Sequence, residues 1–331
     1  MAKLINYAPE AWNHLHGVFC VYKPVDMSVR FMRNVILGNL CRDLNELQPR
    51  HVPPFVAIEG SISEGLVVKQ KENFAAHQLV LGPHYQPKDL RISWAQHLHK
   101  DVSGVCIMGV NRGCVGTHRV RESRLIRTYM VSGKFGCATD NLFHTGKVVE
   151  KSRFAHVTKG KIVRALMSIQ AAHQRASIEF LGLDIHSQEA YEALSCSGLV
   201  RPGEKSSPIL YALSIKEFNP PDFTLEVSSI NETGDYLKEL IHSLGIKLKT
   251  SAVCTQLRCV RYGPWTLGHA LLRKHWTLEH IVNNIGQSYP LLKNITPKSP
   301  SLASLEEKEH RLKKKFMVVA MTCPNMQFVA M

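Results

Sequence analysis

The sequence predicts an α+β protein in which strands and helices interleave without a βαβ repeat. Residues 105–110 form an apolar run without alternation, as in a strand covered on both faces. Residues 223–227 alternate between apolar and polar side chains, which is typical of a half-buried strand. Leu237, Ile241 and Leu244 recur at helical spacing. Strands of both kinds, separated by amphipathic helices, indicate the α+β class.

The first half of the chain begins with a buried strand at residues 18–22, which Lys23-Pro24 ends. Ser28 is placed to cap the helix that follows. Residues 45–89 mix polar residues, prolines and short apolar runs, which predicts an irregular insertion or a hairpin. The strand at 105–110 is followed by another that begins at Tyr129. The apolar positions expected to face the core in the Ser28 helix are Phe31, Val35, Ile36 and Leu40.

The second half alternates helices and strands in the same way. Thr158 starts a helix, and Ser187 caps a further helix that ends at Gly198. The strand at 223–227 leads to a helix that Gly245 closes, and Thr277 opens the last helix. The remaining expected features are the apolar residues Ile162, Leu166 and Ile169 in the Thr158 helix, the strands at 253–260 and 265–267 around the turn Tyr262-Gly263-Pro264, and Ile281 and Ile285 in the last helix.

The length of 331 residues is ample for a substantial core. We expect an N-terminal extension at 1–15, one domain at 16–295, and a basic, mobile tail at 296–331. The tail carries Lys313-Lys314-Lys315, which is more often a solvated stretch than a specific site, although it would add to RNA affinity.

The charge balance favours a polyanionic partner. Lys and Arg total 41 against 27 acidic residues, which gives a net charge of +14 and a pI near 9.4. Each phosphate that Lys or Arg neutralises releases condensed counterions. RNA, DNA and an anionic membrane surface all fit this charge, and so does a basic protein of a basic compartment.

The nine cysteines are scattered, odd in number and without a CxxC pair, which predicts reduced thiols rather than disulfides or a zinc knuckle. No run has the length of a membrane-spanning helix. The N-terminus lacks a secretory signal core, and residues 1–16 hold no Arg, a poor match to a transit peptide. A soluble intracellular protein is the expectation.

Four blocks, in order, resemble the TruB family of pseudouridine synthases. Residues 17–24 look like its N-terminal strand with the Lys-Pro signature, and 90–109 look like its catalytic loop and following strand. The third block is Arg127-Thr128-Tyr129 with the segments 136–140 and 146–150; the fourth is 236–245 with Leu257-Arg258, and the segment 188–202 also fits. The likeness covers about residues 16–295 and is nearest to the mitochondrial TruB-like branch of animals, which lacks the bacterial C-terminal RNA-binding appendage.

The resemblance implies a pseudouridine synthase fold: a mixed, mainly antiparallel sheet with a central RNA-binding cleft flanked by helices. It implies that a uridine is flipped out of an RNA, its glycosidic bond is broken, and C5 is joined to C1′. It further implies a mitochondrial location, no cofactor and no metal. The implied partners are mitochondrial rRNA, tRNA or mRNA, together with mitochondrial RNA-processing or ribosome-assembly proteins.

That chemistry needs three groups. A carboxylate stabilises or captures the positive charge at C1′, an aromatic ring stacks on the flipped base, and a guanidinium holds the carboxylate bidentately. By the resemblance the aromatic group is Tyr129. The ungapped segment 90–104 places His99 where the family has its Asp, and Lys238 falls at the position of the family Arg. The residues expected to bind RNA are Lys23, Arg127 and Arg258.

Both members of the carboxylate–guanidinium pair are therefore changed. A neutral imidazole carries no negative charge, imidazolium would oppose charge at C1′, and an ammonium cannot form the planar fork. Asp101 is a possible substitute, but two residues along an extended chain displace a group by roughly 6.6 Å, far beyond the tolerance of a reacting group. The structural alternatives are a solvent-facing or loop-capping Asp101, a core Tyr129 and a solvated Lys238.

Three functional readings stay open. His97-x-His99-x-Asp101 has the form of a metal-ligand ladder, but no second motif and no repeating βα pattern accompany it. The chain is either an active synthase that uses Asp101 or a rearranged site, or an RNA-binding relative with lost or reduced catalysis. The residues favour the latter, because no known chemistry lets His99 act as the carboxylate.

Overall fold

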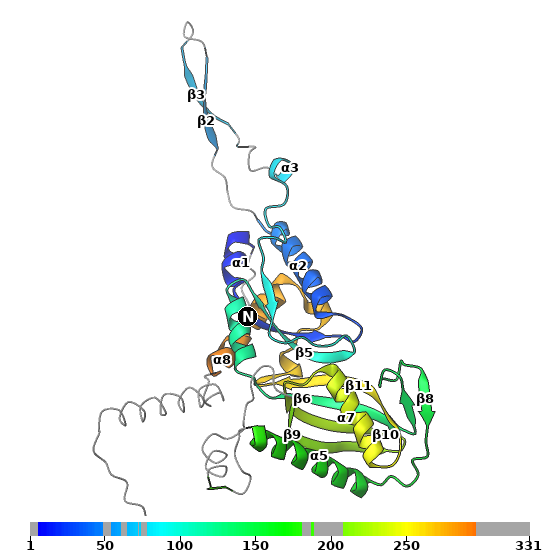
Figure 1. Ribbon diagram of the computed structural model, residues 1–331. Coiled ribbons are helices and arrows are strands. Elements are labelled where there is room, and N and C mark those ends of the chain that lie inside the picture. The colour runs from blue at the N-terminus through cyan, green and yellow to red at the C-terminus, as the bar shows by residue number, and fades with distance from the viewer. Residues whose placement is uncertain are drawn as a thin grey trace, which may run out of the picture. The chain divides into compact units, whose positions relative to one another are not determined.

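A computed structural model describes residues 6–48, 54–60, 65–71, 73, 78–180, 187–188 and 208–295 (Figure 1). The chain divides into two units. The first comprises Met1–Glu122 with Cys259–Ile295, and the second comprises Ser123–Arg258 with Thr296–Met331. Strand β11 (Ala252–Tyr262) contributes residues to both. The expected single domain at 16–295 stays a prediction, and the expected tail lies outside the described residues.

The sheet of the first unit is built on β5 (Val102–Val110), whose nine residues are all buried. This confirms the strand covered on both faces. Strand β1 (Gly17–Lys23) pairs antiparallel with β5, from Gly17 opposite Val110 to Lys23 opposite Gly104. The strand order is β1-β5-β11, with β4 (Ile92–Trp94) beside β5 and β12 (Trp265–Thr266) beside β11. The pairing therefore places the end of β1 opposite the start of β5.

The helices of the first unit are α1 (Ala8–His14), α2 (Val29–Glu46), α3 (Gln78–Leu81), α4 (Gly113–Glu122) and α8 (Leu278–Lys293), with the 3-10 turns η2 (Leu267–His269) and η3 (Arg273–His275). Both α4 and α8 pack against β1. Asn284 of α8 reaches the middle of β1, where its Oδ1 accepts a hydrogen bond from the Cys20 N–H at 2.8 Å. Thr277 is the N-cap of α8, as predicted.

Helix α2 begins as predicted but shows a different face to the core. The Ser28 side chain caps it and accepts a hydrogen bond from the Phe31 N–H at 3.1 Å. The expectation that Phe31 faces the core is wrong, since its side chain is 54% exposed. The reason is the helical period: the buried stripe runs three or four residues apart, and Phe31 lies about 100° from its neighbour Met32. The buried residues are Val29, Met32, Ile36, Leu37, Leu40, Cys41 and Leu44.

The segment 45–89, expected to be an irregular insertion or hairpin, contains a hairpin in its described part. Strands β2 (Phe55–Glu59) and β3 (Val67–Lys71) pair antiparallel, with Phe55 opposite Lys71. Helix α3 follows them.

The second unit has the strand order β11-β6-β10-β9, in which β6 (Arg127–Phe135), β10 (Asp222–Ile230) and β9 (Ile209–Asn219) pair antiparallel. A small second sheet pairs β7 (Cys137–Thr139) with β8 (Val148–Lys151). Helices α5 (Lys159–Phe180) and α7 (Gly234–Lys247) pack on β9 and β6, respectively. The predicted α+β class with a mainly antiparallel sheet is thus confirmed.

The predicted end of α7 at Gly245 is wrong. The helix continues to Lys247, and Gly245 lies inside it. A side chain at this position would collide with Ala252. Glycine here serves close packing rather than termination. The predicted helix from Ser187 to Gly198 lies mostly outside the described residues. Within the part of the chain that the structure describes, no helix is long and apolar enough to cross a membrane.

Gly104 provides a stability test of the β5–β11 region. Its φ is +114°, and a Cβ would collide with the Cys259 backbone. We therefore expect Gly104→Ala to lower the free energy of unfolding by more than about 2 kcal/mol. Gly38→Ala in α2 is the matched control, because nothing lies within 4 Å of a Cβ there, and it should raise stability by about 0.5–1 kcal/mol. Chemical denaturation measures both, and equal stabilities would contradict the close backbone approach at Gly104.

Candidate functional site

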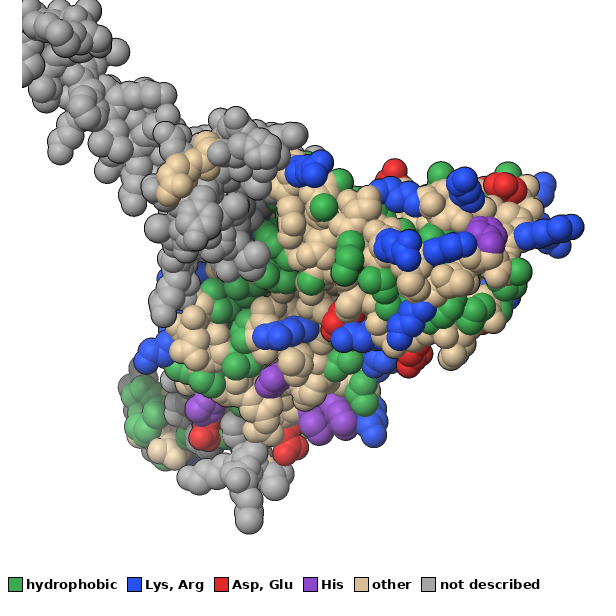
Figure 2. Space-filling view, turned by 90° about the horizontal axis from the view of Figure 1, so that it is seen from below, with side chains coloured by type: hydrophobic (Ala, Val, Ile, Leu, Met, Phe, Trp, Pro, Cys, Tyr) green, Lys and Arg blue, Asp and Glu red, His purple; other side chains and the backbone are tan. Residues whose placement is uncertain are grey.

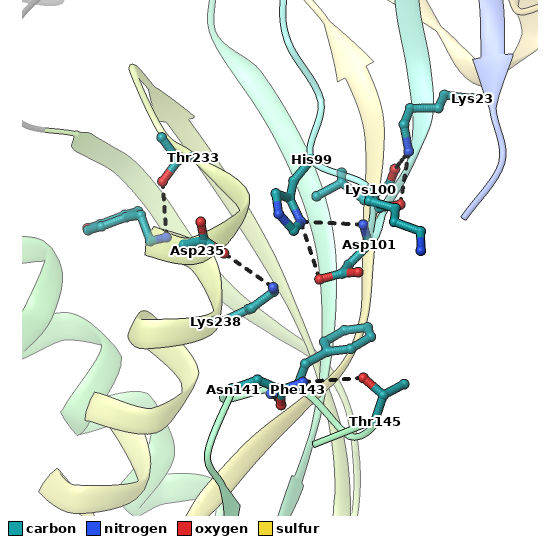
Figure 3. Close-up of polar contacts among 12 residues, drawn as sticks. Lys23, His99, Lys100, Asp101, Asn141, Phe143, Thr145, Thr233, Asp235 and Lys238 are labelled. Carbon is teal, nitrogen blue, oxygen red and sulfur yellow. Dashed lines mark hydrogen bonds and ion pairs between the residues drawn. The ribbon is translucent and has the colours of Figure 1, made fainter. Parts of the chain in front are cut away.

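The loop between β4 and β5 carries His99 and Asp101, which face each other (Figure 3). The Nδ1 atom of His99 lies 3.2 Å from Oδ2 of Asp101, an ion pair when the imidazole is protonated. Their side chains are 41% and 22% exposed. The Val102 N–H donates to the His99 carbonyl at 3.1 Å, which closes a tight turn. Asp101 is therefore engaged with His99 rather than simply solvated.

The last residue of β1, Lys23, lies fully buried beneath this loop. Its ammonium donates to the carbonyls of Pro24 at 3.1 Å, Lys100 at 3.0 Å and Val102 at 2.6 Å. Burial lowers the pKa of Lys23 to about 8. The three hydrogen bonds use the three N–H donors of an ammonium. Lys23, expected to bind RNA, thus has its donors committed to the loop backbone on both sides of Asp101.

Tyr129 lies on β6 in the second unit and is only 2% exposed. The other predicted residue of this strand, Arg127, has its Nε 2.7 Å from Oε1 of Glu232, whose side chain is 0% exposed. Burial raises the pKa of Glu232 above its usual value, and the positive charge of Arg127 opposes that rise. Arg127 therefore pairs with a buried carboxylate.

The sequence analysis missed Glu232. The residue stands between an alternating strand and Thr233, the N-cap of α7, whose hydroxyl accepts the Tyr236 N–H at 3.1 Å. An acidic residue in such a connection is ordinarily solvent-exposed. No spacing or motif in the sequence marks it as buried, because its partners precede it by about a hundred residues.

Lys238 lies on α7 with its side chain 7% exposed, so the alternative of a solvated helix residue is wrong. Its Nζ is 3.2 Å from Asp235 Oδ1 and 5.4 Å from the centre of the Phe143 ring. The Phe143 N–H donates to Asn141 Oδ1 at 2.9 Å, and the Thr139 hydroxyl donates to the Phe143 carbonyl at 2.9 Å. Lys238 is thus held by one carboxylate and one aromatic face.

The geometry brings together Lys23, His99 and Asp101 within the first unit. Within the second it pairs Arg127 with Glu232. Arg258, predicted to bind RNA, is half-buried on β11. Among the described residues, no group of three or more His, Cys, Asp or Glu side chains could hold a metal ion. His97 is exposed, and it does not join the pair formed by His99 and Asp101 into such a group.

Removal of the Lys23 ammonium should destabilise the first unit. We expect Lys23→Met to lower the free energy of unfolding by about 2–4 kcal/mol at pH 7, because buried carbonyls lose their donor. Lys100→Met is the control, since Lys100 is exposed in the same loop, and it should change stability by less than about 0.5 kcal/mol. Urea denaturation compares the two, and a Lys23→Met protein as stable as the control would refute the role of this lysine.

The low pKa of Lys23 also predicts a pH dependence. Its pKa is about 8 in the folded chain against 10.5 for an ordinary lysine. Between these values the unfolded chain binds more protons, so the contribution of Lys23 to stability rises with pH. The stability difference between wild type and Lys23→Met should therefore widen from pH 7.5 to pH 10. Denaturation curves recorded across this range test the sign, and parallel pH profiles would contradict it.

Comparison with known proteins assigns the chain to a family. The family model of TruB family pseudouridylate synthase (N terminal domain) matches residues 85–236. Pseudouridylate synthase TRUB2, mitochondrial, of Xenopus tropicalis is 35% identical over 310 residues, covering 92% of this chain and 94% of the relative. The Homo sapiens protein of the same name is 36% identical over 285 residues, covering 84% and 85%.

Among solved structures, the archaeal box H/ACA sRNP Nop10-Cbf5 complex matches with a TM-score of 0.44 and 15% identity, covering 87% of this chain and 62% of that one. The relatives of Xenopus tropicalis and Homo sapiens match this chain over most of both lengths. The resemblance to the mitochondrial TruB-like branch of animals is therefore confirmed, and the chain belongs to the TruB family of pseudouridylate synthases.

Proposed function

We propose that this chain is a mitochondrial RNA-binding member of the TruB family in which isomerisation of uridine to pseudouridine is lost or reduced. The observation that carries the proposal is the pairing of His99 with Asp101 at 3.2 Å. His99 stands where the family resemblance places the carboxylate, and the carboxylate of Asp101 lies beside the imidazole rather than in its place. At the family position an imidazole, neutral or protonated, supplies no negative charge to stabilise C1′ as the glycosidic bond loosens.

The loop also resists the rearrangement that Asp101 would need to act as the carboxylate. Lys23 binds the carbonyls of Lys100 and Val102, the residues on either side of Asp101. A shift in register would break two of the three hydrogen bonds of the buried ammonium, at a cost of several kcal/mol. Asp101 therefore stays in its own place in the turn, with its carboxylate beside the His99 side chain rather than in place of it.

The change at the guanidinium position agrees with this reading. Lys238 offers a point charge in place of a planar fork, and Asp235 already neutralises it at 3.2 Å. With no carboxylate at position 99 to hold, Lys238 pairs with Asp235 instead.

Binding of RNA requires fewer precisely placed groups than catalysis does. The net charge is +14, and on the face in Figure 2 Lys and Arg side chains gather with few Asp and Glu among them. Such a surface attracts the phosphate backbone without sequence preference, while Tyr129 supplies an aromatic ring for a base. We propose mitochondrial rRNA, tRNA or mRNA as the ligand, with RNA-processing or ribosome-assembly proteins as partners. The relatives named as mitochondrial enzymes support this location.

The alternative function is an active pseudouridine synthase that uses Asp101. One observation favours it: the carboxylate of Asp101 remains 22% exposed and lies beside the family position. The two functions make opposite predictions for the same assay.

Tritium release from [5-³H]uridine-labelled mitochondrial transcripts separates the two functions. We expect wild-type protein to bind the transcripts at moderate salt in a filter assay but to release no tritium above background. The double variant His99→Asp/Lys238→Arg restores the family groups and should raise release about a hundredfold or more.

Asp101→Asn is the matched control for this assay. Wild-type turnover that disappears in Asp101→Asn would overturn the proposed loss of catalysis and establish the alternative. Absence of RNA binding would count against both functions.

A further inference from the structure

The second unit carries a group of exposed cations that the proposed function has not used. They come from the end of β8 and the loop after it, from the first turn of α5, and from the end of α7 with the turn that follows. The segments that hold them, 151–161 and 247–251, contain no Asp or Glu. The members of this basic cluster are Lys151, Arg153, Lys159, Lys161, Lys247 and Lys249.

A chain of hydrogen bonds joins the two segments of the basic cluster. The Ser251 N–H donates to the Ser152 hydroxyl at 2.7 Å, and that hydroxyl lies 3.0 Å from the hydroxyl of Thr250. The Thr250 hydroxyl donates its proton to the Arg153 carbonyl at 3.1 Å. Because each hydroxyl has one proton, Ser152 is the donor to Thr250. All three hydrogen bonds therefore run in one direction, an arrangement in which each strengthens the next.

A further contact fixes the lysines on either side of this chain. The Nε2 atom of His156 lies 2.8 Å from the carbonyl oxygen of Leu248, the residue between Lys247 and Lys249. The start of α5 accordingly lies close to the end of α7 (Figure 1). The Lys161 ammonium donates to the His156 carbonyl at 2.7 Å, which leaves two of its three N–H donors for a ligand. The backbone beneath the cluster is thus fixed before any partner binds.

The charges of the basic cluster do not stabilise the fold. Within the described residues, none of its cations forms an ion pair with an acid. Lys159 and Lys161 lie in the first turn of α5, which has no acidic residue, although the positive end of a helix macrodipole favours acids there. Only Lys247, in the last turn of α7, has the sign that suits its helix end. Like charges held together at a cost to stability indicate a negatively charged partner.

The phosphate backbone of an RNA is the partner that fits the basic cluster. Ammonium and guanidinium groups donate strong hydrogen bonds to phosphate oxygens and release condensed counterions. A membrane surface is also anionic, but a helix that lies on a membrane exposes its apolar face to the lipid. The apolar face of α5 is instead buried within the protein, since its residues Ile162, Leu166 and Ile169 are each at most 6% exposed.

The basic cluster is separate from the candidate site residues of α7. Lys247 lies about 14 Å beyond Lys238 along the helix axis, at 1.5 Å per residue. An RNA that contacts both must therefore extend well beyond a single nucleotide.

We propose that the basic cluster is a second RNA-contacting surface, which binds the phosphate backbone of RNA that extends beyond the nucleotide at the candidate site. This inference rests on the proposed function, in which RNA is the ligand. Phosphates carry no sequence information, so this contact adds affinity without sequence preference. Each phosphate that a cation neutralises contributes roughly 0.7 to the slope of log affinity against log salt concentration for a single strand.

Filter binding of a stem-loop RNA with one unpaired uridine, measured at several salt concentrations, tests this proposal. The cluster variant Lys159→Gln/Lys247→Gln/Lys249→Gln removes three of the charges. We expect its dissociation constant at moderate salt to rise about tenfold or more, and its salt slope to become shallower by about two. Lys151→Gln/Arg153→Gln is an independent variant from the β8 side, which should act in the same direction even if the first variant does not fold.

Lys88→Gln/Lys274→Gln/Lys293→Gln is the matched control. It removes the same charge from exposed positions of the first unit, so it should change the salt slope by less than about half, because distant exposed charges are screened by salt. Replacing the same three lysines of the cluster by Arg keeps the charges and should preserve wild-type binding.

The outcomes distinguish this inference from the proposed function. Wild-type protein that binds no RNA would contradict the proposed function, and the basic cluster would lose its ligand with it. Wild-type binding that weakens equally in the cluster variant and in the matched control would overturn the cluster alone. Unchanged RNA binding by the cluster variant, together with lost binding to phosphatidylserine-containing vesicles, would overturn RNA as the partner in favour of a membrane surface.

Discussion

The hydrogen bonds of the buried Lys23 ammonium are the constraint on which the rest of the first unit depends. Three backbone carbonyls accept the hydrogen bonds of this charge. The cost of burying a lysine is large, so these carbonyls cannot move away without replacement. The end of β1 and the start of β5 are consequently locked together, with Lys23 opposite Gly104. The loop that carries His99 and Asp101 inherits this rigidity.

In the second unit, as in the first, cationic side chains lie close to groups that compensate their charge. Arg127 pairs with Glu232, and Lys238 pairs with Asp235. Lys238 is buried and Arg127 is partly buried, and each has an acid close by. Both cations thus have an acidic partner within the same unit.

Much of the fold was predictable because it depends on local patterns. The continuous apolar run of β5, the Ser28 cap of α2 and the Thr277 cap of α8 all follow from nearest-neighbour chemistry. The predictions were wrong at positions where tertiary packing, rather than the local sequence pattern, determines the structure. Phe31 is apolar yet exposed, because the stripe through Met32 occupies the core. Gly245 looks like a helix end but lies within α7, where Ala252 leaves no room for a side chain.

The sequence by itself determined the family and led to the proposed exchange at His99 and Lys238, because motif order and spacing are properties of the chain alone. It could not show that Lys23 faces the loop backbone, that Lys238 is buried, or that a buried Glu232 pairs with Arg127. Those facts belong to the tertiary structure, since the partners are separated by up to about a hundred residues and meet only through strand pairing and helix packing. Burial then sets the charge state and the orientation of these groups, which no local pattern encodes.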